Sequence, residues 1–136
     1  MRFFRLTPAA PPHVLLVESG SRRLLEGVLP YLRRCYGEQA PVSLVTCFAG
    51  APEGLPAGAA VYRVHEYRGR EGRKRLYNQL LGSGVSVLAM ICSGEPILSR
   101  WKWALALRLP VQVLVVNENG DYFWFNRSNW KTIRRL

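Results

Sequence analysis

Two short polar turns carry the side chains in this sequence that are best suited to chemistry. Glu18-Ser19-Gly20-Ser21 follows an apolar run at residues 13–17, and Cys92-Ser93-Gly94-Glu95 follows another at residues 85–91. Each turn combines serine hydroxyls, a glycine and a carboxylate. Glutamate can serve as a general base, and glutamate together with serine suits the hydroxyl groups of a sugar or an alcohol.

Other chemistry at these turns is less well supported by the sequence. Neither turn has the Gly-x-Ser-x-Gly pattern of a nucleophile elbow, and no histidine follows His65 as a partner. Glu95 and Pro96 weaken the second turn as an anion site, because a carboxylate there occupies the helix amides. The first turn is the better anion site, since it leads directly into Arg22 at a helix start. A purely structural interpretation, a tight turn with a serine cap, stays open for both.

We expect neither a cofactor nor a metal. The chain has no Gly-x-Gly-x-x-Gly fingerprint for a nicotinamide or flavin nucleotide. Its cysteines are widely spaced, and its two histidines are isolated, which is unlike a metal site. Cys47 and Cys92 each close an apolar run, which predicts buried thiols in a reducing compartment.

Short apolar runs alternate with helical patterns along most of the chain. Continuous apolar runs are typical of strands that are buried on both faces of a parallel sheet. Strands are predicted at residues 13–17, 42–47, 60–64, 85–91 and 111–116, and helices at residues 22–36, 68–81 and 97–109. This alternation predicts an α/β fold, a three-layer Rossmann-like sandwich with a mostly parallel sheet of about five strands in the order 3-2-1-4-5.

The end of the sequence predicts an antiparallel addition to this sheet. Asn119-Gly120 is a strong hairpin signal, and residues 122–125 would return as an edge strand. Ser128 is suited to cap a helix that has barely begun when the sequence ends. We expect an irregular lead-in over residues 1–12, one domain over residues 13–126, and over residues 127–136 the start of a helix from a longer chain.

The predicted strand order brings the two polar turns together. Ligands of open parallel sheets bind beyond the carboxyl ends of the strands, where the strand order reverses, which here is between the first and fourth strands. Glu18 and Glu95 are therefore the predicted catalytic or hydroxyl-binding carboxylates. The predicted substrate-binding residues are Ser19, Gly20, Ser21, Arg22, Ser93 and Gly94, with Asn117 and Glu118 after the fifth strand.

The charge of the chain points to anionic partners. The formal net charge is +10, and its densest basic cluster is Arg68-Gly69-Arg70-Glu71-Gly72-Arg73-Lys74-Arg75. Such a cluster favours phosphates, anionic lipid or nucleic acid, and it is also compatible with a solvated helix start. Nucleic acid is the less favoured partner, since no RNA-binding aromatic motif is present.

Several stretches resemble the N-terminal half of a GT-B glycosyltransferase of the heptosyltransferase type. The resemblance is carried by HVLLVESGS, LPYLRRCYG, VSLVTC and VSVLAMICSGEPILSRWKWALALRLP. In that family a second, C-terminal domain binds the nucleotide-sugar, while the N-terminal domain receives the acceptor. The family's first loop usually carries a Gly-Asp pair whose acid serves as base, whereas this chain has Glu18-Ser19-Gly20-Ser21 there.

The resemblance implies an acceptor-side domain that binds a sugar phosphate or a lipid-linked acceptor and is inactive without its missing C-terminal region. A further stretch, NENGDYFWFNRSNW, resembles uncharacterised bacterial proteins with an apolar tail further on. It implies a cytoplasmic domain held at the inner face of a membrane by a segment outside this chain. The alternative function is a non-catalytic basic module that binds nucleic acid or anionic lipid.

Overall fold

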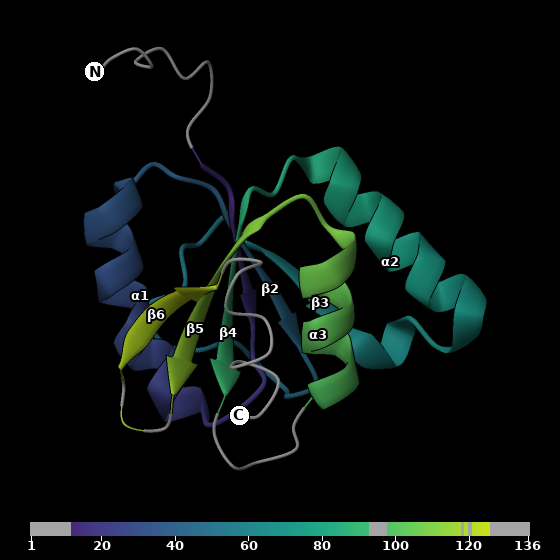
Figure 1. Ribbon diagram of the computed structural model, residues 1–136, viewed down its shortest axis with the longest axis horizontal. Helices are drawn as coiled ribbons and strands as arrows, with labels where there is room; N and C mark the ends of the chain where they lie inside the picture. The colour runs from purple at the N-terminus through teal and green to yellow at the C-terminus, as the bar shows by residue number, and fades with distance from the viewer. Residues whose placement is uncertain (1–11, 93–97, 118, 120, 126–136) are drawn as a thin grey trace.

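A single six-stranded sheet forms the centre of the molecule, with the strand order β3-β2-β1-β4-β5-β6 (Figure 1). The computed structural model describes residues 12–92, 98–117, 119 and 121–125. The strands are β1 (Val14–Val17), β2 (Val42–Thr46), β3 (Ala60–Arg63), β4 (Val87–Cys92), β5 (Gln112–Asn117) and β6 (Tyr122–Phe125). β1 to β5 are mutually parallel, which confirms the predicted order 3-2-1-4-5.

β6 pairs antiparallel with β5 at one edge of the sheet. The turn between them includes Glu118 and Gly120, which lie outside the described residues. The same holds for residues 1–11 and 126–136, where most of the lead-in and the C-terminal helix were predicted.

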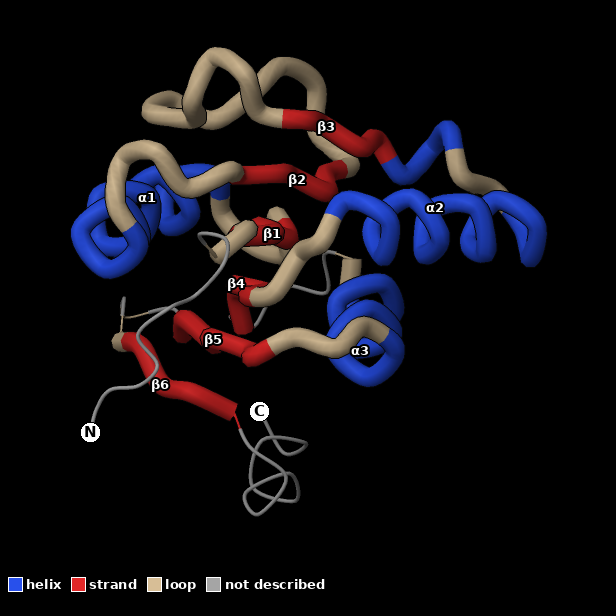
Figure 2. The backbone as a smooth tube through the Cα atoms, turned by 90° about the horizontal axis from the view of Figure 1, so that it is seen from above, coloured by secondary structure: helices blue, strands red, loops and turns tan. Residues whose placement is uncertain are grey.

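Within the described residues, three helices cover the two faces of the sheet (Figure 2). They are α1 (Arg22–Tyr36), α2 (Gly69–Ser83) and α3 (Ser99–Arg108), and the short 3-10 helix η2 (Val64–Glu66) precedes α2. α1 covers one face, while α2 and α3 lie side by side on the other. The predicted ends of the strands and helices lie within two residues of the observed ones, which is the usual uncertainty at element ends.

The alternation of strand side chains builds a separate core on each face. In β1, Val14 and Leu16 pack with the apolar residues of α1, while Leu15 and Val17 pack with those of α2 and α3. All four residues of β1 are buried. This two-sided burial explains why β1 reads as an unbroken apolar run in the sequence.

The connection from β2 to β3 contains no helix. Residues 47–59 instead run as a loop on the side of the sheet that α1 covers (Figure 2). The prediction of a buried Cys47 is wrong, because β2 ends at Thr46 and Cys47 is exposed where this loop begins. Cys92, the last residue of β4, is half-buried.

In the part of the chain that the structure describes, no helix is both long enough and apolar enough to cross a membrane.

Candidate functional site

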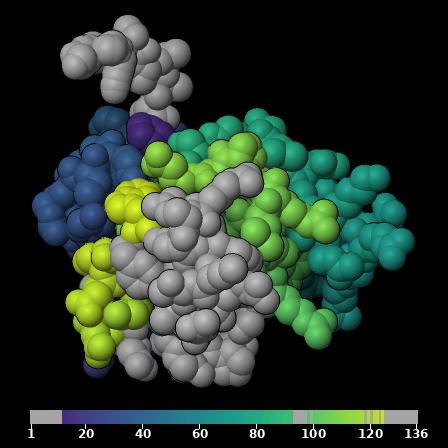
Figure 3. Space-filling view, in the orientation of Figure 1, coloured from purple at the N-terminus to yellow at the C-terminus, as the bar shows by residue number. Residues whose placement is uncertain are grey.

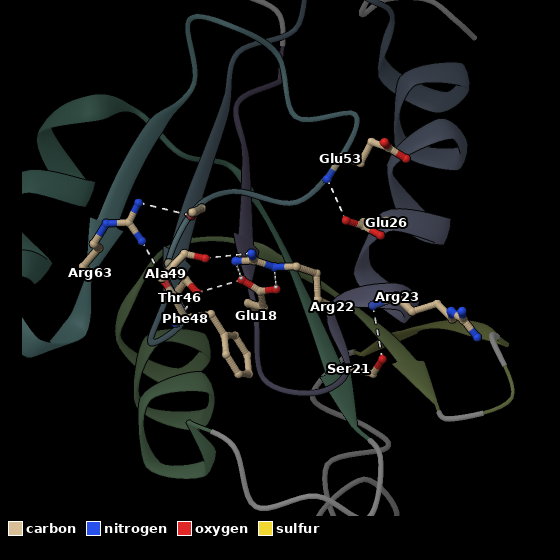
Figure 4. Close-up of polar contacts among 11 residues, drawn as sticks. Glu18, Ser21, Arg22, Arg23, Glu26, Thr46, Phe48, Ala49, Glu53 and Arg63 are labelled. Carbon is tan, nitrogen blue, oxygen red and sulfur yellow. Dashed lines mark hydrogen bonds and ion pairs between the residues drawn. The ribbon is translucent and has the colours of Figure 1, made fainter.

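Glu18 lies at the carboxyl end of β1 and is the centre of a buried polar network (Figure 4). Its side chain is fully buried and forms a two-point ion pair with Arg22, the first residue of α1. Arg22 Nε donates to Glu18 Oε2 at 2.7 Å, and Nη2 donates to Oε1 at 3.0 Å. The hydrogen bond from Arg22 to the Glu18 carboxylate raises the pKa of Arg22 above its ordinary value.

Thr46 connects this ion pair to the end of β2. Its hydroxyl donates to Glu18 Oε1 at 2.7 Å and accepts the backbone N–H of Phe48 at 2.9 Å. Glu18 therefore accepts three hydrogen bonds and has about one acceptor position left, since a carboxylate offers roughly four. To act as a general base, Glu18 would have to receive the proton at this one remaining position.

Two arginines hold the loop that follows β2. Arg63 donates to the carbonyl oxygens of Phe48 and Gly50 at 2.7 and 3.1 Å, and Arg22 donates to that of Ala49 at 2.8 Å (Figure 4). Three consecutive carbonyl groups are thus satisfied by guanidinium groups, where a helix would have satisfied them internally.

Ser19 joins β1 to β4 through its side chain. β1 ends at Val17, yet the buried Ser19 hydroxyl donates to the carbonyl of Ile91 at 2.8 Å and accepts the Ile91 N–H at 3.0 Å. The hydroxyl thereby continues the pairing of the two strands at the point where β1 leaves the sheet. Because the Ser19 hydroxyl is buried and both bonds are made within the protein, its role in this structure is to hold β1 and β4 together.

The other predicted site residues have different surroundings. Ser21 is the N-cap of α1 and accepts the N–H of Arg23 at 3.1 Å, as its structural interpretation predicted. Gly20 is buried beside it. Asn117 organises the turn after β5, because its Oδ1 accepts the N–H groups of Asn119 and Asp121. Ser93, Gly94, Glu95 and Glu118 lie outside the described residues.

Lys102 of α3 is a buried cation that the sequence analysis missed. Its side chain reaches the end of β4, where Nζ donates to the carbonyl of Ile91 at 3.0 Å. Burial raises the pKa of the adjacent Cys92 thiol, although the Lys102 ammonium group lowers it in part. Cys92 is therefore a poor nucleophile at neutral pH, because the thiolate is the reactive form.

A second candidate site lies between α2 and α3. The two helices adjoin along one side of the molecule (Figure 3) and enclose a groove of about 550 Å³. We call it the α2–α3 groove. Its lining residues are Val64, Tyr67, Arg68, Gly69, Arg73, Tyr77, Arg100, Trp101, Ala104 and Arg108.

Four guanidinium groups line the α2–α3 groove, two from the α2 side and two from α3. None of the described lining residues is acidic. The ion pairs among described residues involve Arg22, Arg33 and His65, so none of the four groove arginines is paired with a described carboxylate. Uncompensated positive charge is therefore concentrated here, whereas at the end of β1 the charge of Arg22 is balanced by Glu18.

The groove also has an aromatic part. The rings of Tyr77 and Trp101 meet edge to face, with their centroids 6.2 Å apart. The Arg108 guanidinium lies 5.3 Å from the centroid of Tyr77. Tyr77 and Trp101 are half-buried, so part of each ring is accessible.

A four-residue spacing in the sequence could have revealed this groove. The lining residues Gly69, Arg73 and Tyr77 repeat along α2, and Arg100, Ala104 and Arg108 repeat along α3. Residues four apart share one helix face. The four-residue spacing can be seen in the sequence of each helix. That these two helix faces lie next to each other follows only from the fold.

No cluster of metal-ligating side chains occurs among the residues that the structure describes. Comparison of the chain with family models, with curated proteins and with solved structures finds no match. The resemblance to GT-B glycosyltransferases therefore stays a prediction.

Proposed function

We propose that this chain is a Rossmann-like binding domain for a phosphate-containing ligand, whose phosphate binds in the α2–α3 groove. The observation that carries the proposal is the set of four groove arginines without a described carboxylate partner. Guanidinium groups bind phosphate oxygens through paired, charge-assisted hydrogen bonds. The groove is large enough for a ligand of several groups, since small-molecule sites begin at about 300 Å³.

The end of β1 supports anion binding less well. Arg22 already donates to Glu18 through two nitrogens and to Ala49 through a third, so an incoming phosphate would compete with a buried carboxylate. Breaking a buried ion pair is costly, because it leaves an uncompensated charge. We therefore assign Glu18 and Arg22 to positioning the loops around the sheet.

The proposal is tested by titrating the protein with inorganic pyrophosphate in a calorimeter at low ionic strength. We expect Arg73→Gln and Arg100→Gln each to weaken binding about fivefold, which is the effect of losing one exposed charge contact. Arg34→Gln is the matched control, because it removes the same charge from α1 on the other face of the sheet. Absence of pyrophosphate binding, or an equal loss in the control, would overturn the proposal.

The glycosyltransferase hypothesis needs a separate test. It is supported by the position of Glu18 and Ser19 beside each other at the end of β1, where a Rossmann-like sheet binds ligands. If this acceptor-side function is correct, Glu18→Gln will abolish the binding of a sugar phosphate and leave pyrophosphate binding unchanged. Equal binding of the sugar phosphate by the variant and the natural chain would refute it.

A further inference from the structure

We infer that the ligand of the α2–α3 groove is a nucleoside phosphate, an inference that rests on the proposed phosphate binding. A phosphate alone needs only guanidinium groups. The groove adds Tyr77 and Trp101, two half-buried aromatic residues whose rings meet 6.2 Å apart on the facing sides of the two helices. Aromatic side chains in such positions stack on nucleobases.

Arg68 and Arg73 lie nearer the start of α2 than the aromatic residue Tyr77. Tyr77 contacts both Trp101, near the start of α3, and Arg108, at its end. Arg73 lies one helical turn earlier on α2, and Arg68 precedes that helix. The eight helical steps from residue 69 to residue 77 span about 12 Å. The groove is therefore longer than a single phosphate group and accommodates a phosphate next to a ring.

The position of Arg108 also favours binding of a nucleobase next to Tyr77 and Trp101. Its guanidinium lies 5.3 Å from the centre of the Tyr77 ring, so a planar cation and two aromatic rings are grouped together. Guanidinium planes stack on nucleobases as aromatic rings do. In the bound complex, Arg68, Arg73 and Arg100 hold the phosphates, while Tyr77, Trp101 and Arg108 hold the base.

Two sources can supply this chemistry, a free nucleotide and a nucleotide within single-stranded nucleic acid. The experiment therefore titrates the whole chain with ADP, with inorganic pyrophosphate and with a short single-stranded oligonucleotide. We expect ADP to bind about tenfold more tightly than pyrophosphate, since stacking of one base contributes about 1–3 kcal/mol. An oligonucleotide that binds more tightly still, with a steep salt dependence, identifies nucleic acid as the source. One that binds no more tightly than ADP identifies the free nucleotide.

Variants assign the base contact. Tyr77→Leu and Trp101→Leu remove one ring each and should reduce the advantage of ADP over pyrophosphate, while Trp101→Phe should retain most of it. Trp124→Leu is the control, because Trp124 is exposed on β6, away from the groove. Each variant is first checked for native circular dichroism and cooperative unfolding, since Trp101 also packs against the core.

The outcomes separate this inference from the function on which it rests. If ADP and pyrophosphate bind equally well, the nucleoside inference is overturned and phosphate binding stands. If neither binds, both are overturned. An ADP advantage that survives Tyr77→Leu and Trp101→Leu would also overturn the assignment of the base to this groove.

Discussion

At the scale of single residues, Glu18 and Arg22 form the ion pair with the most deeply buried carboxylate among the described residues. The carboxylate is fully buried, and the guanidinium is 29% exposed. A buried carboxylate depends on its partner, because burial without compensation removes its hydration. The pair therefore matters to stability mainly because the loss of either partner would leave the other charge without compensation and lower the free energy of unfolding.

Replacing Arg22 tests this dependence. Arg22→Met keeps most of the side-chain stem but leaves Glu18 buried without its cation, so we expect the free energy of unfolding to fall by about 3 kcal/mol. The double variant Glu18→Met, Arg22→Met should recover part of this loss, because no buried charge is left. Urea unfolding at neutral pH measures these two variants and the single variant Glu18→Met. A double variant as unstable as the sum of the two single variants would show that the pair is not coupled.

Ser19 offers a second test at this scale. In Ser19→Ala, the Ile91 carbonyl keeps the hydrogen bond from Lys102, but the buried Ile91 N–H loses its acceptor. We expect a loss of about 2 kcal/mol, the cost of an unsatisfied buried donor. Ser83→Ala, which removes a hydroxyl from the exposed end of α2, should change the unfolding free energy by no more than about 0.5 kcal/mol. Similar losses in the two variants would contradict this role for Ser19.

The sequence could predict where these residues lie but not what they contact. Glu18 and Ser19 follow an apolar run, and that pattern places them at the end of β1. Their partners Thr46 and Ile91 are 28 and 72 residues away along the chain. Lys102 belongs to an apolar helical segment, in which a lysine is usually expected on the solvent side. Lys102 is buried because α3 packs over the end of β4, and this packing cannot be predicted from a single sequence.

At the scale of elements, the start of α2 depends on a glycine. An added Cβ at Gly72 would lie 2.3 Å from the carbonyl carbon of Tyr67 and 2.7 Å from its oxygen. Backbone atoms cannot move aside as a flexible side chain can. The chain before α2 therefore approaches the first turn of the helix more closely than any larger residue would allow.

Two alanine substitutions in the same helix should have opposite effects. Gly72→Ala should lower the free energy of unfolding by about 2 kcal/mol through this clash. Gly82→Ala, where the Cβ meets open space, should raise it by about 0.5 kcal/mol through helix propensity. Thermal unfolding of both variants measures the difference. Because Tyr67 also lines the α2–α3 groove, Gly72→Ala should weaken pyrophosphate binding as well, whereas Gly82→Ala should not.

The elements themselves were largely predictable. Strands buried on both faces must be apolar throughout, and the helices must present an apolar face, so both patterns are direct consequences of the layered packing. The prediction for Cys47 failed because an apolar run does not show where a strand leaves the sheet. Likewise, nothing local in residues 47–59 shows that two distant arginines replace a helix there.

At the scale of the whole molecule, several groups resist ionisation at high pH. Burial raises the pKa of the Cys92 thiol, which is ordinarily 9.0, and the pKa values of the phenols of Tyr36 and Tyr62, which are ordinarily 10.0. The folded chain holds these protons more tightly than the unfolded chain. Their contribution to stability is thus complete below the ordinary pKa values and is lost as pH rises through the raised ones.

We therefore expect the urea midpoint to fall as pH rises above about 9, and to continue falling above about pH 10. Cys92→Ala and Tyr62→Phe should each make the fall smaller, because each removes one of the ionising groups. Ser83→Ala serves as the control, since it removes an exposed hydroxyl that does not ionise in this range. A midpoint that rises over this range would contradict the expected direction.

The bond between Ser19 and Ile91 has a consequence for experiment. The Ile91 amide proton is held by a side-chain oxygen at the junction of β1 and β4, while the strand amides around it are held by backbone carbonyls. Its hydrogen-exchange rate therefore reports the opening of that one junction separately from the rest of the sheet. A ligand that enters between β1 and β4 will alter the protection of this amide, whereas a ligand confined to the α2–α3 groove will leave it unchanged. A single resonance in an exchange spectrum can thus distinguish the two sites without any substitution.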